Sequence, residues 1–149
     1  MYRDAGTWPG NVRFLDHVAP PEHRPFYCSS PATLNVTRKS MAAMGYCPSG
    51  RLFEAAACGT AVLSDWWEGL DTFFKPNEEI LVARSSDDAV RAITADQECI
   101  RQIGQRAMER ALDCHTAEAR ARRLVSLLED LPNESAFEVT AAVLASRNV

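Results

Sequence analysis

The sequence predicts an α/β domain, in which a parallel β-sheet is flanked by helices and followed by further helices. Short apolar runs alternate with helical patterns between residues 11 and 95, which is the order of strands and crossover helices in a parallel sheet. From residue 96 to residue 132, apolar residues recur only at the three- and four-residue spacing of helices. We therefore predict a loop over residues 1–10, a Rossmann-like core over 11–95, C-terminal helices over 96–132 and a weakly helical tail over 133–149.

The first half of the core is expected to contain two strands and two short helices. Residues 11–15 form an apolar run after a loop that contains glycine and proline. Pro21 favours the start of a short helix over residues 22–28, because proline fits the first turn of a helix. A second strand over 32–36 follows, and then a short helical turn or loop over 40–45.

The centre of the core is predicted to be a helix, a tight turn and a buried strand. Ser49 can cap a helix over residues 50–58, and Gly59 stands where a helix often ends in a left-handed residue. Residues 61–64 then form a buried strand. Glu54 does not fit this simple pattern, because it lies among small and apolar residues of the helix. An unpaired buried carboxylate is costly, so we expect Glu54 to reach a cleft or to have partners.

The second half of the core is expected to end the sheet. A short helix over residues 69–74 precedes a fourth strand over 80–83, and Ser85 can cap the helix that follows. Two longer helices complete the chain, and Thr116 is the expected cap of the second. Alternation of this kind favours a sheet that is covered on both faces.

Composition argues against several classes of protein. With 149 residues, a formal net charge of −4 and interspersed charges, the chain offers no broad basic face for nucleic acid. No apolar run approaches the roughly 18 residues of a membrane-spanning helix. The five cysteines are scattered without a C-x-x-C pair, which favours reduced thiols and a cytoplasmic protein. His17, His23 and Cys28 match no zinc spacing, so we predict no metal site.

A ligand is expected at the carboxyl ends of the strands, where right-handed crossovers bring loops and helix starts together. Hydroxyl, basic, acidic and aromatic residues follow the predicted strands there: Thr37, Arg38, Lys39, Ser49, Gly50, Arg51, Asp65, Trp66, Glu68 and Gly69. The helix start at Ser49 favours a phosphate group through its backbone amides and its dipole. Glu54 lies about 6 Å further along the helix, which suits a carboxylate that accepts both hydroxyls of a ribose.

Ordinary structural roles compete with ligand roles at most of these positions. Ser49 is more often only a helix cap, and a cation such as Arg38 at a strand end is more often solvated. Trp66 and Trp67 are more often core or interface aromatics than stacking platforms. Glu54 therefore carries the most weight, because a packing role explains it least well.

A resemblance to a known family rests on the run PSGRLFEAAACGTAVLSD at residues 48–65, with Thr37-Arg38 before it and Glu79-Ile80-Leu81 after it. This pattern resembles the C-terminal, nucleotide-sugar-binding half of GT-B glycosyltransferases, and within them the branch grouped with spore maturation protein CgeB and the group 1 glycosyl transferases. The resemblance covers about residues 10–130. It implies one half of a GT-B fold, a nucleoside-diphosphate sugar as substrate and no cofactor. It also implies an N-terminal GT-B domain as partner, without which the chain would be inactive.

The resemblance assigns roles to nine residues. Glu54 is similar to the ribose-binding glutamate, and Ser49, Gly50 and Arg51 would lie at the diphosphate. Arg38 would be a second cation. The remaining residues, which would line the donor cleft, are Asp65, Trp66, Glu68 and Gly69. Many relatives have a second glutamate eight positions before the first, where this sequence has Tyr46, so the resemblance implies neither a retaining mechanism nor a catalytic residue.

Two other functions are alternatives to this one. A non-catalytic interaction module with a Rossmann-like fold would bind a protein through exposed Trp66 and Trp67 and its helical stripes. A receiver-like signalling domain would need an acidic pair after an early strand, and only Asp16 and His17 follow residues 11–15. Whatever the function, we expect exposed apolar surface and self-association of a chain that lacks a partner domain.

Overall fold

A computed structural model describes residues 9–131 and divides the chain into two compact units, Met1–Glu109 and Arg110–Val149. The predicted tail over 133–149 and most of the predicted loop over 1–10 lie outside the described residues. The division into a core over 11–95 and helices over 96–132 stays a prediction.

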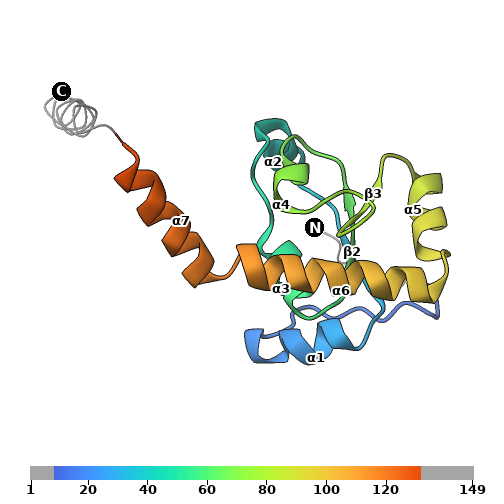
Figure 1. The fold of residues 1–149 in the computed structure, drawn as a ribbon. Helices are drawn as coiled ribbons and strands as arrows, with labels where there is room; N and C mark the ends of the chain where they lie inside the picture. The colour runs from blue at the N-terminus through green and yellow to red at the C-terminus, as the bar shows by residue number, and fades with distance from the viewer. Residues whose placement is uncertain (1–8, 132–149) are drawn as a thin grey trace, which may run out of the picture. The chain divides into compact units, whose positions relative to one another are not determined.

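The first unit is built on a parallel sheet (Figure 1). Within the described residues it has three strands, in the order β1 (Ala32–Asn35), β2 (Ala61–Asp65) and β3 (Leu81–Ala83). Both pairings are parallel, with Thr33 opposite Val62 and Leu63 opposite Leu81. The predicted α/β fold, a Rossmann-like parallel sheet flanked by helices, is therefore confirmed.

The strand predicted over residues 11–15 is wrong. These residues form no ladder with β1, and the Val12 amide donates to the Pro9 carbonyl at 2.9 Å, which makes a turn instead. The apolar side chains of Val12, Phe14 and Leu15 are exposed. An apolar run becomes a strand only if a neighbouring strand accepts it, and β1 stays an edge strand here.

The helices of the first unit lie within two residues of the predicted positions. They are a 3₁₀ turn η1 (Pro20–Glu22), α1 (His23–Cys28), α2 (Lys39–Met44), α3 (Gly50–Ala57), α4 (Leu70–Phe73), α5 (Ser86–Ile93) and the greater part of α6 (Gln97–Cys114). Two predicted caps are confirmed, because Ser49 Oγ accepts from the Arg51 amide at 3.4 Å and Ser85 Oγ accepts from the Asp88 amide at 3.1 Å. Gly59, directly after α3, has the expected left-handed φ of 72°.

Helices pack on both faces of the sheet. Successive strand residues point to opposite faces, so Val62 and Leu63 enter different clusters. Leu63 belongs to the cluster with α6, which consists of Ala61, Leu63, Leu81, Ile100 and Ile103. Val62 lies near Leu52 of α3 and Phe74, and all three are buried. Burial of side chains of this size contributes roughly 1.5–3 kcal/mol each, so this packing fixes α3 against the sheet.

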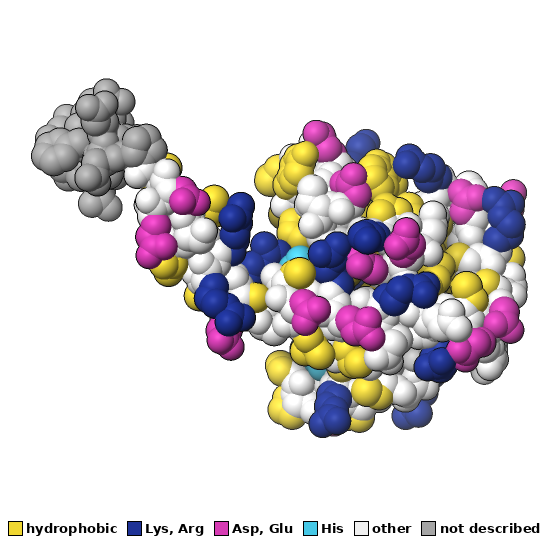
Figure 2. Space-filling model, in the orientation of Figure 1, with side chains coloured by type: hydrophobic (Ala, Val, Ile, Leu, Met, Phe, Trp, Pro, Cys, Tyr) yellow, Lys and Arg dark blue, Asp and Glu magenta, His cyan; other side chains and the backbone are white. Residues whose placement is uncertain are grey.

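Polar side chains join the carboxyl ends of β1 and β2. Asn35 and Ser64 are paired in the ladder, and the buried Asn35 amide donates to Ser64 Oγ at 3.2 Å. One residue further on, Asp65 Oδ1 accepts from the Thr37 amide at 2.8 Å. These bonds hold the loops after the two strands at one edge of the sheet. On the face of the first unit seen in Figure 2, acidic and basic side chains are interspersed.

The second unit, as far as it is described, contains the end of α6 and α7 (Ala117–Glu129). Thr116 Oγ1 accepts from the Ala119 amide at 3.2 Å and confirms the predicted cap. An ion pair between Glu118 and Arg122, 3.3 Å apart, lies one turn along the helix. Among residues 9–131, no helix has the length and apolar character needed to cross a bilayer.

Candidate functional site

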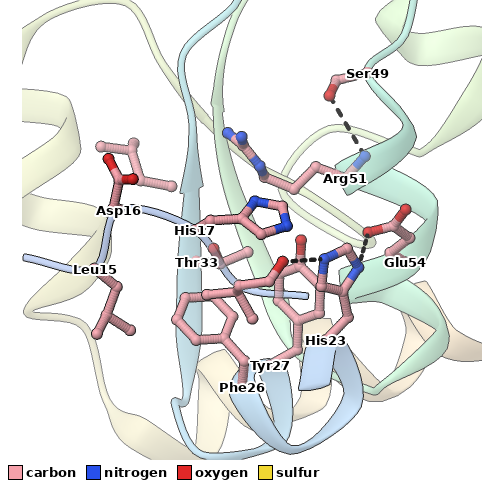
Figure 3. A pocket seen from close by; sticks show the side chains of 12 residues that line it. Leu15, Asp16, His17, His23, Phe26, Tyr27, Thr33, Ser49, Arg51 and Glu54 are labelled. Atoms are coloured by element: carbon pink, nitrogen blue, oxygen red, sulfur yellow. Dashed lines mark hydrogen bonds and ion pairs between the residues drawn. The ribbon is translucent and has the colours of Figure 1, made fainter. Parts of the chain in front are cut away.

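A cleft of about 510 Å³ lies between α1, the first turns of α3 and the segment that leads into η1 (Figure 3). Its apolar lining is formed by Leu15, Val18, Phe26 and Leu34. Its polar lining is formed by Asp16, His17, His23, Tyr27, Thr33, Ser49, Arg51 and Glu54. Three of the nine predicted ligand residues, Ser49, Arg51 and Glu54, therefore share one cavity.

The N-terminal turn of α3 forms one end of this cleft. Ser49 caps the helix, and the exposed Arg51 extends from its first turn. Gly50, between them, presents no side chain, so a ligand can come close to the positive end of the helix dipole. Arg51 also lies beside Tyr27. Burial and the charge of Glu54 raise the pKa of the Tyr27 hydroxyl, while Arg51 acts in the opposite direction.

Glu54 reaches the cleft and also has a partner. Its side chain is 49% exposed, and Oε2 lies 3.1 Å from Nδ1 of His23. The other carboxylate oxygen, Oε1, lies on the side of the helix start, because a Cβ atom placed on Gly50 would be 3.9 Å from it. One oxygen of the Glu54 carboxylate thus contacts α1, and the other faces the N-terminal turn of α3.

The position of the His23 ring is fixed by its contacts with Tyr27 and Val18. Tyr27, one turn later on α1, is buried and meets the His23 ring edge-on at a centroid distance of 6.1 Å. The buried Thr60 Oγ1 donates to the Tyr27 carbonyl at 2.8 Å and fastens α1 to the turn between α3 and β2. At its other nitrogen, His23 Nε2 lies 3.1 Å from the Val18 carbonyl oxygen. His23 therefore connects the segment before η1 with α3.

The other predicted ligand residues lie outside this cavity. Arg38 is exposed at the start of α2, and the Asp65 carboxylate is bonded to the Thr37 amide. Trp66 is half-buried, with the Arg84 guanidinium 4.9 Å from its ring centroid. The Glu68 carbonyl accepts from the Tyr46 amide at 2.7 Å, and Gly69, at φ 91°, packs against the Tyr46 ring.

Sequence reasoning missed the wall of the cleft opposite α3. His23, Tyr27 and the segment over residues 15–18 come from parts of the chain distant from Glu54, and no spacing pattern links them. His17 and His23 were considered only as metal ligands. In the part of the chain that the structure describes, no three His, Cys, Asp or Glu side chains are grouped to hold a metal ion.

The structure gives Trp67 the core role that the sequence analysis favours for a tryptophan at this position. Trp67 is only 3% exposed, and its ring packs against Phe73 at a centroid distance of 6.0 Å. It lies two residues after the end of β2, in the loop that leads to α4, and its side chain is part of the core. An exposed pair of tryptophans, as a protein-interaction module would use, is therefore not present at residues 66 and 67.

A parallel α/β sheet with a carboxylate and a cation near a helix start is the architecture of one half of a GT-B glycosyltransferase. The chain belongs to the glycosyl transferase-like family, whose sequence model matches residues 2–126. Its fold is similar to that of sucrose-phosphate synthase from Thermosynechococcus elongatus, with a TM-score of 0.53 and 25% sequence identity. The match covers 70% of this chain and 26% of that enzyme, so the chain spans about a quarter of its length. No curated protein matches the chain significantly.

Proposed function

We propose that the chain is the donor-binding half of a glycosyltransferase and that the cleft beside α3 binds the nucleoside diphosphate of a nucleotide sugar. The observation that carries this proposal is the presence of Glu54, Arg51 and the start of α3 in one cavity. The cavity volume of about 510 Å³ lies within the usual range of ligand pockets, roughly 300–1,000 Å³.

The proposed arrangement follows the chemistry of the ligand. A diphosphate lies at the N-terminal turn of α3, where backbone amides, the helix dipole and Arg51 favour negative charge. The ribose lies beside Glu54, whose two oxygens accept hydrogen bonds from its two hydroxyls. In this arrangement the base faces the apolar lining at Leu15 and Val18.

The sugar end of the donor extends along the carboxyl edge of the sheet in this proposal. Asp65 at the end of β2, together with Trp66, Glu68 and Gly69 after it, lines that part of the donor cleft, and Arg38 supplies a second cation. The contact between the Tyr46 amide and the Glu68 carbonyl supports this, because it joins the loop after β2 to the segment that leads into α3.

Transfer of the sugar needs charge stabilisation of the leaving diphosphate, which the helix amides and Arg51 supply as the charge develops. We assign no catalytic residue. Tyr46 stands where many relatives have a carboxylate, and its side chain is 60% exposed. Acceptor binding falls to an N-terminal GT-B half, so we expect no transfer by this chain alone.

Other features of the chain belong to the same proposal. We place it in the branch grouped with spore maturation protein CgeB and in the cytoplasm, which the five free cysteine thiols support. Leu34 and Val36, at the edge strand β1, are 57% and 69% exposed. Such an apolar edge favours association with a partner half or with a second copy of the chain.

Isothermal titration calorimetry of the 149-residue chain with UDP and with GDP tests the proposal. We expect one of them to bind and the Glu54→Gln variant to bind it about ten- to a hundredfold more weakly, because hydrogen bonds to a charged group contribute roughly 1.5–3 kcal/mol. Glu109→Gln, the same change on an exposed face of α6, is the control and should leave the affinity unchanged. Absence of binding by both diphosphates would contradict the proposal.

A further inference from the structure

The ring of His23 lies between two acceptor groups on opposite walls of the cleft (Figure 3). Nδ1 is 3.1 Å from the Glu54 carboxylate, and Nε2 is 3.1 Å from the Val18 carbonyl oxygen. The His23 side chain is 34% exposed, so a ligand in the cleft can come close to it.

The two contacts restrict the protonation of His23. A backbone carbonyl and an ionised carboxylate can only accept hydrogen bonds. A neutral imidazole has one N–H group, so it can satisfy only one of these acceptors. Both contacts can be hydrogen bonds at the same time only in the form in which both ring nitrogens carry hydrogen.

We propose that His23 is a positioning residue of the nucleoside site, which holds Glu54 in the orientation needed to bind a ribose. This inference rests on the proposed function of the cleft. His23 occupies one acceptor position on Oε2 of Glu54 and leaves Oε1, on the side of Gly50, open to a sugar hydroxyl. A carboxylate has about four acceptor positions, so the ribose and His23 can be bound at once.

The contact with His23 favours binding because it lowers an entropy cost. Glu54 is exposed and would otherwise sample several rotamers, and fixing it before the ligand arrives reduces the entropy lost on binding.

A double-mutant cycle tests the inference. Affinity for UDP, or for GDP if that is the ligand, is measured by calorimetry in the wild type, His23→Gln, Glu54→Gln and the double variant. We expect His23→Gln to weaken binding about three- to thirtyfold in the wild-type background and to have no further effect beside Glu54→Gln. The same substitution should leave the affinity for the 2′,3′-dideoxy analogue unchanged, since that ligand has no hydroxyls for Glu54.

Two controls separate positioning from a structural role. His115→Gln removes an imidazole from the second unit and should not change the affinity. His23→Asn is a second variant for the case in which His23→Gln does not fold, as judged by circular dichroism. Equal losses of affinity for the ribo and dideoxy ligands, or an equal loss beside Glu54→Gln, would overturn the inference.

The result also distinguishes this inference from the function on which it rests. If neither UDP nor GDP binds the wild type, both fail. If one binds and Glu54→Gln weakens it while His23→Gln does not, the proposed function stands and the role of His23 is refuted.

Discussion

A substitution of Gly104 on α6 tests most sharply how closely α6 packs on the turn that follows α3. A Cβ atom at this position would overlap the Gly59 carbonyl oxygen and lie 3.0 Å from both Ala61 N and Gly59 C. All three are backbone atoms, so no change of rotamer can relieve the overlap. The helix would have to move away from the turn between α3 and β2, and would take the buried side chains of Ile100 and Ile103 with it.

The size of the effect follows from two opposing terms. Alanine is about 1 kcal/mol more favourable than glycine inside a helix. Overpacking costs typically about 1–3 kcal/mol, and contact with rigid backbone places Gly104→Ala at the upper end. We expect the free energy of unfolding to fall by about 2 kcal/mol, measured by urea unfolding with circular dichroism and an unchanged m value.

Gly10→Ala is the matched control for this substitution. Nothing lies within 4 Å of a Cβ atom at Gly10, so the free energy of unfolding should change by less than about 0.5 kcal/mol. A Gly104→Ala protein that is as stable as the wild type, or more stable, would refute the close packing of α6 on this turn.

Three further predictions concern stability and titration. Thr60→Val should lower the free energy of unfolding by about 1–2 kcal/mol in urea titrations, because the Tyr27 carbonyl loses its buried donor. Hydrogen bonds from Arg101 lower the pKa of Glu98 to about 2, so Arg101→Gln should raise it toward 4.5 in an NMR titration. Any stabilisation from Glu98 is present above its unfolded pKa and is lost as the pH falls toward 2. Burial raises the pKa of both Tyr27 and Cys58, so the unfolded chain loses these protons first. Thermal melts should therefore show stability falling above about pH 8.5; a flat profile to pH 11 would count against this.

Much of the fold could be predicted because its signals are local. Ser49, Ser85 and Thr116 bond to amides two or three residues away, so a short stretch of sequence contains both partners. Gly59 needs a positive φ for the same local reason. The order of strands and helices followed from hydrophobic spacing alone, which is why the parallel α/β class was predicted correctly.

The remainder depends on contacts between distant residues. Residues 11–15 have the composition of a strand, but they lack the neighbouring strand that would accept their hydrogen bonds. Trp67 packs against Phe73, only six residues further along the chain, but whether this pair faces the core or the solvent depends on the tertiary packing. The contact between His23 and Glu54 joins α1 to α3, and neither residue's surroundings in the sequence indicate the other.

The candidate site could be predicted only in part, because some of its residues are placed by local geometry and others by distant contacts. Ser49, Arg51 and Glu54 lie on one helix start, so their common position followed from helical geometry. Asp65 and Trp66 were placed at the same edge of the sheet, which is where they lie, but their side chains have partners in Thr37 and Arg84. The direction of a loop side chain depends on those partners and is not contained in a strand pattern.

The central claim is that Glu54 binds the hydroxyls of a ribose. Its most direct test is the ratio of affinities for a nucleoside diphosphate and its 2′,3′-dideoxy analogue, measured by calorimetry in the wild type and in Glu54→Gln. We predict that the wild type prefers the ribose form by about tenfold or more and that Glu54→Gln loses most of this preference. An equal preference in both proteins, or no preference in the wild type, would contradict the claim.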